Sequence, residues 1–219
     1  MRKRFWDERW CRNEIGFHKP DVHPYLKSYL HRLNAQTGET IFVPLCGKSL
    51  DLLWLRDQGL EVVAVEWNRL AVEAFFRENS LDADVVNHGG AEIWRTPGVS
   101  IYLGDFFALD KKILSGARLV YDRAALVALP PDMRRKYAVH LSELLPGGSR
   151  LLLVANHYDM VEEDGGPPFS VPPTEVIELF GDDFSIDRLC SEETIRNHPG
   201  LRSRGLTAFH DAVYLLVRR

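Results

Sequence analysis

The sequence is poor in cysteine. It has three cysteines in 219 residues, Cys11, Cys46 and Cys190, and they lie far apart. An odd number of distant cysteines forms neither a CxxC motif nor a disulfide framework, so we expect reduced thiols. The eight histidines share no metal-like spacing with the cysteines. We therefore assign no metal site.

Blocks of basic residues and long apolar runs are also absent. The formal net charge is −4 at pH 7, so binding to nucleic acid or to an anionic membrane has no electrostatic support. No apolar run reaches the length that crosses a membrane. The basic start, MRKRFWDERW, is not followed by the apolar core of a signal peptide. We expect a cytoplasmic monomer with no nucleic-acid or membrane partner.

What the sequence does contain is typical of a globular α/β domain. Hydrophobic residues make up 45% of the chain and charged residues 26%, which excludes a disordered protein. The length suffices for one domain with a sizeable core. We find no internal repeat, low-complexity tract or interdomain linker. The sequence therefore predicts a single domain over residues 1–219.

The most informative stretch runs from Thr40 to Glu66. A β-branched and aromatic run at 41–43 predicts a strand, and leucines at helical spacing from Leu50 predict a helix. Ser49 and Asp51 are candidate N-caps. A second strand, 62–65, ends at Glu66. The acid follows Cys46 by 20 residues, the interval at which nucleotide-binding β-α-β units place a ribose-binding acid.

This turn contains one glycine, Gly47, rather than three. A dinucleotide pyrophosphate needs close backbone approach at several points, so the turn favours a smaller zwitterion such as S-adenosylmethionine. The turn and the helix N-terminus can offer N–H groups to a ligand carboxylate, while Glu66 can accept two ribose hydroxyls. An ordinary β-α-β unit that happens to end in Glu66, and a nicotinamide-dependent oxidoreductase, are the alternatives.

Polar residues follow two further predicted strands. Asp105 comes after a strand at 100–103, and Asp122-Arg123 comes after a continuous apolar strand at 117–121. In open parallel sheets, ligands gather at the carboxyl ends of the strands. A turn-capping aspartate and an intrachain salt bridge are the structural alternatives for these two positions.

The other elements are predicted from periodicity and turn residues. Trp6 and Trp10 share one face of a predicted amphipathic helix, and a Gly/Pro loop spans 164–173. Further helices are expected at 24–33, 70–79, 131–145 and 174–180, with Thr174 capping the last. Further strands are expected at 150–155, 185–189 and 212–217, the last two as an antiparallel hairpin, and one or two short strands within 83–97.

Several of these segments carry a resemblance. FVPLCGKSLDLLWL followed by VVAVE resembles the signature of the thiopurine S-methyltransferase family, as do FWDERW, GFH, YDRAALVALPP, GPPFSVPP and the final VYLL. The match covers nearly the whole chain in order. It implies a Rossmann-like class I methyltransferase fold: a mostly parallel, seven-stranded sheet with an antiparallel C-terminal strand and helices on both faces. It also implies an N-terminal cap, residues 1–35, over the active site.

The resemblance also implies a reaction and a site. S-adenosylmethionine is the methyl donor, and the acceptor is an aromatic or heterocyclic thiol of the thiopurine kind, methylated by in-line displacement. Inorganic selenium or tellurium, or aliphatic thiols, are alternative acceptors, and a non-catalytic cofactor-binding module is a further reading. The residues expected to bind the donor are Trp10, Leu45, Gly47, Glu66, Asp105, Phe106 and Arg123.

For the acceptor, the resemblance points to Phe17 and Phe169. We hypothesise that Arg123 favours the thiolate, that Asp122 orients Arg123, and that no single side chain is essential as general base. An aromatic thiol is acidic enough to ionise without one. Asn156 to Asp159 follow another strand and are further candidates for the acceptor pocket, as is one arginine among Arg196, Arg202 and Arg204.

Overall fold

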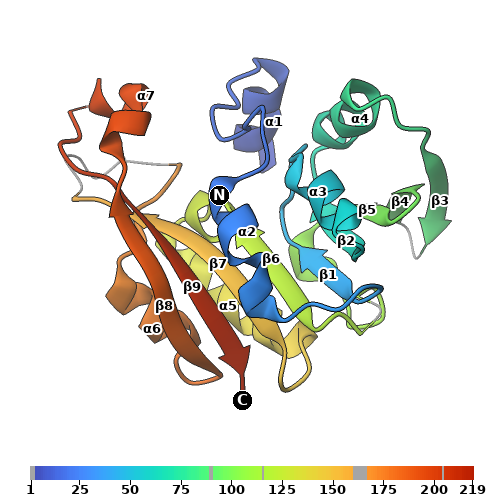
Figure 1. Cartoon of the computed structure of the whole chain (residues 1–219). Helices are drawn as coiled ribbons and strands as arrows, with labels where there is room; N and C mark the ends of the chain where they lie inside the picture. Colours follow the sequence, from blue (N-terminus) through green and yellow to red (C-terminus); the bar gives the residue numbers. More distant parts are fainter. Residues whose placement is uncertain (1–2, 89–90, 115, 160–166, 204) are drawn as a thin grey trace. The chain divides into compact units, whose positions relative to one another are not determined.

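The computed structural model describes residues 3–88, 91–114, 116–159, 167–203 and 205–219. The chain forms two compact units, Met1–Tyr121 and Asp122–Arg219. Figure 1 colours the first from blue to lime green and the second from lime green to red. The single domain over 1–219 and the cap over 1–35 remain predictions.

The first unit contains the stretch from Thr40 to Glu66. Its helices are α1 (Lys3–Cys11), α2 (Pro24–Tyr29), α3 (Asp51–Asp57) and α4 (Arg69–Glu78), with 3-10 turns η1 (Leu30–Leu33) and η2 (Phe106–Ala108). Its strands are β1 (Thr40–Val43), β2 (Glu61–Glu66), β3 (Asp84–His88), β4 (Ala91–Thr96), β5 (Val99–Leu103) and β6 (Leu119–Arg123). The last two residues of β6 belong to the second unit.

The strands of the first unit follow the order β3-β4-β5-β2-β1-β6. The pairs β5–β2, β2–β1 and β1–β6 are parallel, with Phe42 opposite both Val63 and Val120. Ile41 and Phe42 are fully buried, as expected for strands covered on both faces. Within the segment 83–97, the least readable in the sequence, the described residues form the antiparallel pair β3–β4. Helices α3 and α4 pack against β2 and β5.

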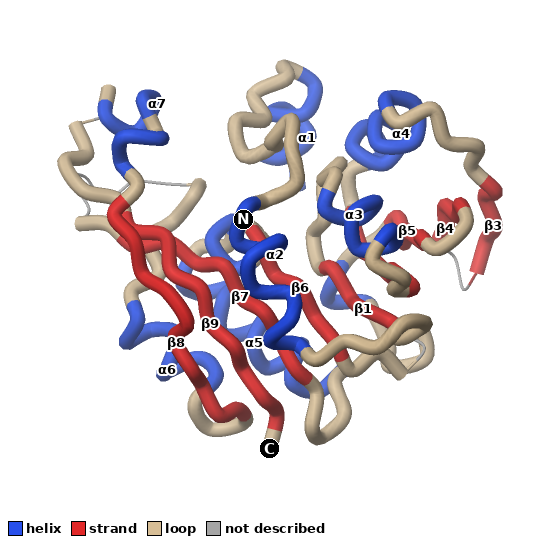
Figure 2. Tube along the Cα trace, in the orientation of Figure 1, coloured by secondary structure: helices blue, strands red, loops and turns tan. Residues whose placement is uncertain are grey.

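The second unit has an antiparallel sheet. It contains α5 (Pro131–Leu144), β7 (Arg150–His157), α6 (Pro173–Phe180), β8 (Phe184–Glu193), α7 (Pro199–Arg202), β9 (His210–Arg218) and the 3-10 turns η3 (Leu126–Ala128) and η4 (Ile195–Asn197). β9 pairs antiparallel with both β7 and β8. Figure 2 shows α5 and α6 on the same side of these strands. The predicted C-terminal hairpin is therefore confirmed, with strands longer than expected.

Two of the predicted helix caps, Asp51 and Thr174, are wrong, whereas the Ser49 hydroxyl accepts a hydrogen bond from the amide of Asp51, the first residue of α3. Helix α3 has Leu50 at its N-cap without a side-chain bond, and α6 begins at Pro173 rather than after Thr174. The Asp51 carboxylate instead accepts hydrogen bonds from the His23 amide and the Tyr121 hydroxyl, so tertiary partners compete for it. Proline suits the first helical turn because its missing N–H would be unpaired there; α5 begins in the same way, as predicted. Among the described residues, no helix is long and apolar enough to cross a membrane.

Candidate functional site

The turn after β1 is built around Gly47 and Glu66. Gly47 has φ of +56°, a left-handed conformation that glycine adopts readily. Its amide donates a hydrogen bond of 2.8 Å to Oε2 of Glu66, which is the last residue of β2 and only 5% exposed. The predicted pairing of turn and acid therefore exists. The amide that the sequence analysis offered to a ligand carboxylate serves to hold the acid.

The second oxygen of Glu66 is held as well. The Asn68 amide donates to Oε1 over 2.8 Å, so both oxygens have fixed directions. Burial raises the pKa of Glu66, and the hydrogen bonds from the backbone of Asn68, Gly47 and Trp67 oppose that rise. A carboxylate has about four acceptor positions, so acceptor capacity remains for a ligand hydroxyl. This arrangement fits the ribose of S-adenosylmethionine.

The backbone before Gly47 is strained. Leu45, a residue with a full side chain, has φ of +45°, and such outliers gather at functional sites. The neighbouring amide of Cys46 donates to the Val65 carbonyl, which joins the turn to β2. Burial raises the pKa of the Cys46 thiol well above its usual range, so packing is its main role.

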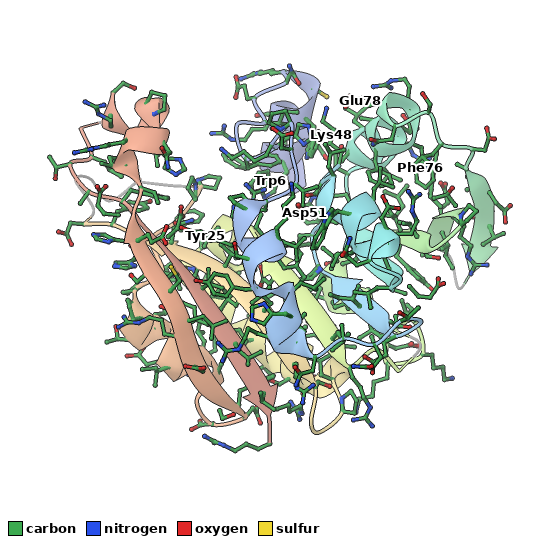
Figure 3. All side chains as sticks on the ribbon, viewed as in Figure 1. Trp6, Tyr25, Lys48, Asp51, Phe76 and Glu78 are labelled. Carbon is green, nitrogen blue, oxygen red and sulfur yellow. The ribbon has the colours of Figure 1, made fainter. Side chains whose placement is uncertain are left out.

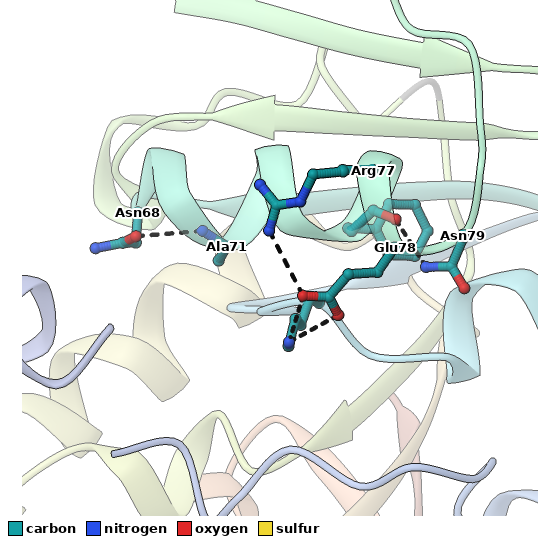
Figure 4. A network of polar contacts seen from close by, with 7 residues as sticks. Asn68, Ala71, Arg77, Glu78 and Asn79 are labelled. Atoms are coloured by element: carbon teal, nitrogen blue, oxygen red, sulfur yellow. Dashed lines mark hydrogen bonds and ion pairs between the residues drawn. The ribbon is translucent and has the colours of Figure 1, made fainter. Parts of the chain in front are cut away.

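Lys48 extends the turn toward helix α4, and the sequence analysis did not single it out. Its ammonium group contacts both carboxylate oxygens of Glu78, at 2.7 and 2.9 Å, and its side chain is 10% exposed. Figure 3 labels both residues, and Figure 4 shows Glu78 near the end of α4 beside Arg77. The turn is therefore fixed to the sheet through Glu66 and to α4 through Lys48.

Helix α1 covers this turn with aromatic side chains. A methyl group placed on Gly47 would lie 3.5 Å from Cζ2 of Trp10, so the indole rests on the glycine. Phe17 packs edge-on against both Trp10 and Trp6, each at 5.6 Å between ring centroids. Flat aromatic faces beside a buried carboxylate suit a ligand that combines an adenine ring with a sulfonium cation.

The residues after β5 have mainly structural contacts. Asp105 is exposed and accepts a hydrogen bond from the Phe107 amide at 3.0 Å, so it caps η2. The ring of Phe106 is 2% exposed and stacks on Phe42 at 6.4 Å. The capping alternative therefore describes Asp105, and Phe106 serves the core. Their contact with adenine remains a prediction.

In the second unit, Asp122 anchors the turn that follows β6. It is fully buried and accepts hydrogen bonds from the amides of Ala125 and Leu126 and from the Tyr137 hydroxyl, the last at 2.7 Å. Burial raises the pKa of Asp122 to about 6, against the opposing effect of these bonds. Tyr137, on α5, is a partner that the sequence pattern did not reveal.

Arg123 is the last residue of β6 and is half-buried. The next residue, Ala124, has φ of +69°, so this strand also ends in a strained turn. The bonds of Asp122 hold that turn and thereby fix the backbone that carries Arg123. Direct orientation of the guanidinium by Asp122 remains a hypothesis.

Phe169 is held on two sides within the second unit. Its amide donates to the Val127 carbonyl at 2.7 Å, and the guanidinium of Arg134 lies over its ring at 5.8 Å. Arg134 is buried and is itself held by the Leu129 carbonyl and by Glu175. A ring fixed in this way suits the wall of a pocket. Residues 164–166 of the predicted loop lie outside the described residues.

Asn156 and His157 end β7, where the sequence predicted acceptor-pocket candidates. The His157 ring stacks on His210 at 4.8 Å, and burial lowers the pKa of His157, so its imidazole is neutral at pH 7. Arg196 and Arg202 are exposed. Arg204 lies outside the described residues.

The structure thus brings four predicted residues together at one turn, Trp10, Leu45, Gly47 and Glu66. A solved structure of a SAM-dependent methyltransferase from Methanosarcina mazei has the same fold, with a TM-score of 0.59 and 18% identity over 90% of this chain and 98% of that chain. The fold defines the class: the chain has the class I methyltransferase fold.

The particular family follows from sequence. A family model described as thiopurine S-methyltransferase matches residues 1–219. The chain is 46% identical to proteins named thiopurine S-methyltransferase from Pseudomonas paraeruginosa strain PA7 and Pseudomonas putida strain GB-1. Each alignment covers the full length of this chain and of the relative. The chain belongs to the thiopurine S-methyltransferase family. It is an S-adenosylmethionine-dependent S-methyltransferase, which removes the oxidoreductase alternative.

Proposed function

We propose that the protein methylates the sulfur of aromatic or heterocyclic thiols of the thiopurine kind, and that Glu66 binds the donor's ribose. The family assignment supports the reaction. The observation that carries the site is the buried Glu66 carboxylate, whose two oxygens are directed by the amides of Gly47 and Asn68. Trp10 covers the same turn.

The roles of the residues follow from their positions. When bound, S-adenosylmethionine supplies a methyl group on a sulfonium, which is a good leaving group. Glu66 binds the ribose hydroxyls, Leu45 and Gly47 shape the turn beside it, and Trp10 excludes water. Positioning of donor and acceptor supplies most of the acceleration, up to about 7–11 kcal/mol when the orientation is ideal. Asp105 and Phe106 border the adenine through their backbone.

On the acceptor side, we propose that Phe17 and Phe169 contact the ring of the thiol. Arg123 favours the thiolate, because a nearby cation stabilises an anion. Asp122 supports Arg123 through the turn that it anchors. No dedicated base is needed for a thiol that ionises near neutral pH.

The experiment is calorimetric titration of S-adenosylmethionine into a Glu66→Gln variant. Glutamine has nearly the volume of glutamate, but it is neutral and its NH₂ group would face a backbone amide that also donates. The hydrogen bonds to the ribose hydroxyls therefore weaken. Each bond to the charged acceptor contributes about 1.5–3 kcal/mol. Glu61→Gln, an exposed position on the same strand, is the matched control. Wild-type affinity in Glu66→Gln would remove Glu66 from the site.

We further propose a cytoplasmic monomer. The cysteines Cys11, Cys46 and Cys190, all among the described residues, form no disulfide, as suits a reducing compartment. The large exposed apolar side chains of the described residues, Leu70, Val85, Val139 and Ile177, lie on four separate elements. Sedimentation equilibrium tests the monomer. A product screen with thiols, selenite and tellurite decides between the acceptor classes and excludes a non-catalytic module.

A further inference from the structure

Asn68 connects three elements of the first unit. Its backbone amide donates to the Glu66 carboxylate at the end of β2. Its side-chain Oδ1 accepts a hydrogen bond of 3.3 Å from the backbone amide of Ala71 in the first turn of α4, which Figure 4 shows. Its Nδ2 donates to Oδ1 of Asp7, on α1, at 2.8 Å. Asn68 is 3% exposed. A buried side chain with its polar groups bonded in this way has a closely fixed orientation.

The bond to Asp7 reaches the same helix that covers the turn. Asp7 precedes Trp10 by three residues on α1, close to one helical turn. Trp10 rests on Gly47, and the Gly47 amide is bonded to Glu66. Glu66, the turn at Gly47 and helix α1 are therefore linked to one another by contacts that include those of Asn68.

We propose that Asp7 and Asn68 are positioning residues for S-adenosylmethionine. They hold α1 over the turn and orient Glu66, and they touch neither the donor nor the acceptor. The inference rests on the proposed role of Glu66 in ribose binding. Loss of the Asp7–Asn68 bond frees α1 from its anchor on Asn68, so the protein binds the donor more weakly.

The chain allows a test by exchange of the two residues. Asn68→Asp keeps the oxygen that caps α4 but places two carboxylates face to face. We expect its Kd for S-adenosylmethionine to rise at least about tenfold, as for the loss of a bond to a charged acceptor. Adding Asp7→Asn restores a donor opposite the new carboxylate. The double variant should therefore return to within about threefold of the wild-type Kd, a difference of less than about 0.7 kcal/mol.

Three controls separate the bond from other effects. Asp7→Asn alone keeps an acceptor for Asn68 and should stay within about threefold of wild type, since only the charge is lost. Asp7→Ala combined with Asn68→Asp removes the repulsion but restores no bond, so it should not match the exchanged pair. Glu8→Gln removes an exposed carboxylate from the same helix, where it pairs with Arg4, and should leave the Kd unchanged.

A further readout separates positioning from general damage. Hydrogen exchange of the α1 amides should speed up in Asn68→Asp and slow again in the exchanged pair. The inference is overturned if Asn68→Asp binds the donor normally, or if Asp7→Asn does not rescue it. If Glu66→Gln binds the donor with wild-type affinity, the proposed function of Glu66 fails instead.

Discussion

The buried Asp122 carboxylate predicts how the free energy of unfolding depends on pH. Its carboxylate is fully buried, and its pKa is raised from 3.8 to about 6. At 1.36 kcal/mol per pKa unit, ionised Asp122 makes the folded state less stable by about 3 kcal/mol than the protonated form does. Asp122→Asn presents a neutral group of the same shape, so it removes this pH-dependent cost while the oxygen can still accept the amides of Ala125 and Leu126.

The sign follows from proton binding. Between pH 3.8 and about 6, the folded protein keeps a proton on Asp122 that the unfolded chain has lost. The contribution of Asp122 to the free energy of unfolding therefore falls as pH rises through that window. Above the window, the whole destabilisation by the ionised carboxylate is present. The free energy of unfolding of Asp122→Asn minus that of wild type should increase by about 2 kcal/mol between pH 4 and pH 7.

The assay is urea unfolding of both proteins at several pH values between 4 and 8. Other carboxylates titrate equally in the two proteins, so the difference isolates Asp122. A third protein, Tyr137→Phe, loses a hydrogen bond that lowers the pKa of folded Asp122. The upper end of its pH window should therefore lie at higher pH than in wild type. Parallel curves for wild type and Asp122→Asn across this range would refute the raised pKa.

Three further predictions concern other sites. Arg123→Ala should shift the acid limb of the pH–rate profile with an aromatic thiol to higher pH, because the thiolate loses a cation; an unchanged profile excludes that role. Gly47→Ala should lower the free energy of unfolding in urea by about 1–2 kcal/mol because alanine is strained at positive φ; equal stability would contradict this. Glu175→Gln leaves the buried Arg134 guanidinium without its charge partner and should cost about 3 kcal/mol. Glu178→Gln, exposed on the same helix, should cost nothing measurable in the same assay.

The local elements were largely readable in the sequence because they depend on neighbours along the chain. The β-branched run at 41–43, the single Gly47 and the acid at the end of β2 belong to one short segment, so periodicity and spacing suffice to predict them. That β1 and β2 are parallel neighbours followed from the β-α-β pattern. The segment 83–97 was hard to read because an antiparallel pair at a sheet edge has a weak periodic signal.

The partners of buried polar groups were not readable. No spacing rule connects Asp7 with Asn68, Asp51 with Tyr121, or Asp122 with Tyr137, because each pair meets only after distant segments pack. Lys48 and Arg134 were missed for the same reason, since a lysine or arginine in a sequence is usually exposed.

By itself, the sequence determined the class of fold, the family and the position of the acid at the end of β2, because these rest on local pattern. The tertiary structure decided what the acid is bonded to, and it turned the lone-glycine amide from an expected ligand donor into a support for Glu66. It also decided that Asp122 is buried with a raised pKa. Burial and hydrogen bonding arise from groups far apart along the chain, and only the folded molecule brings those groups together.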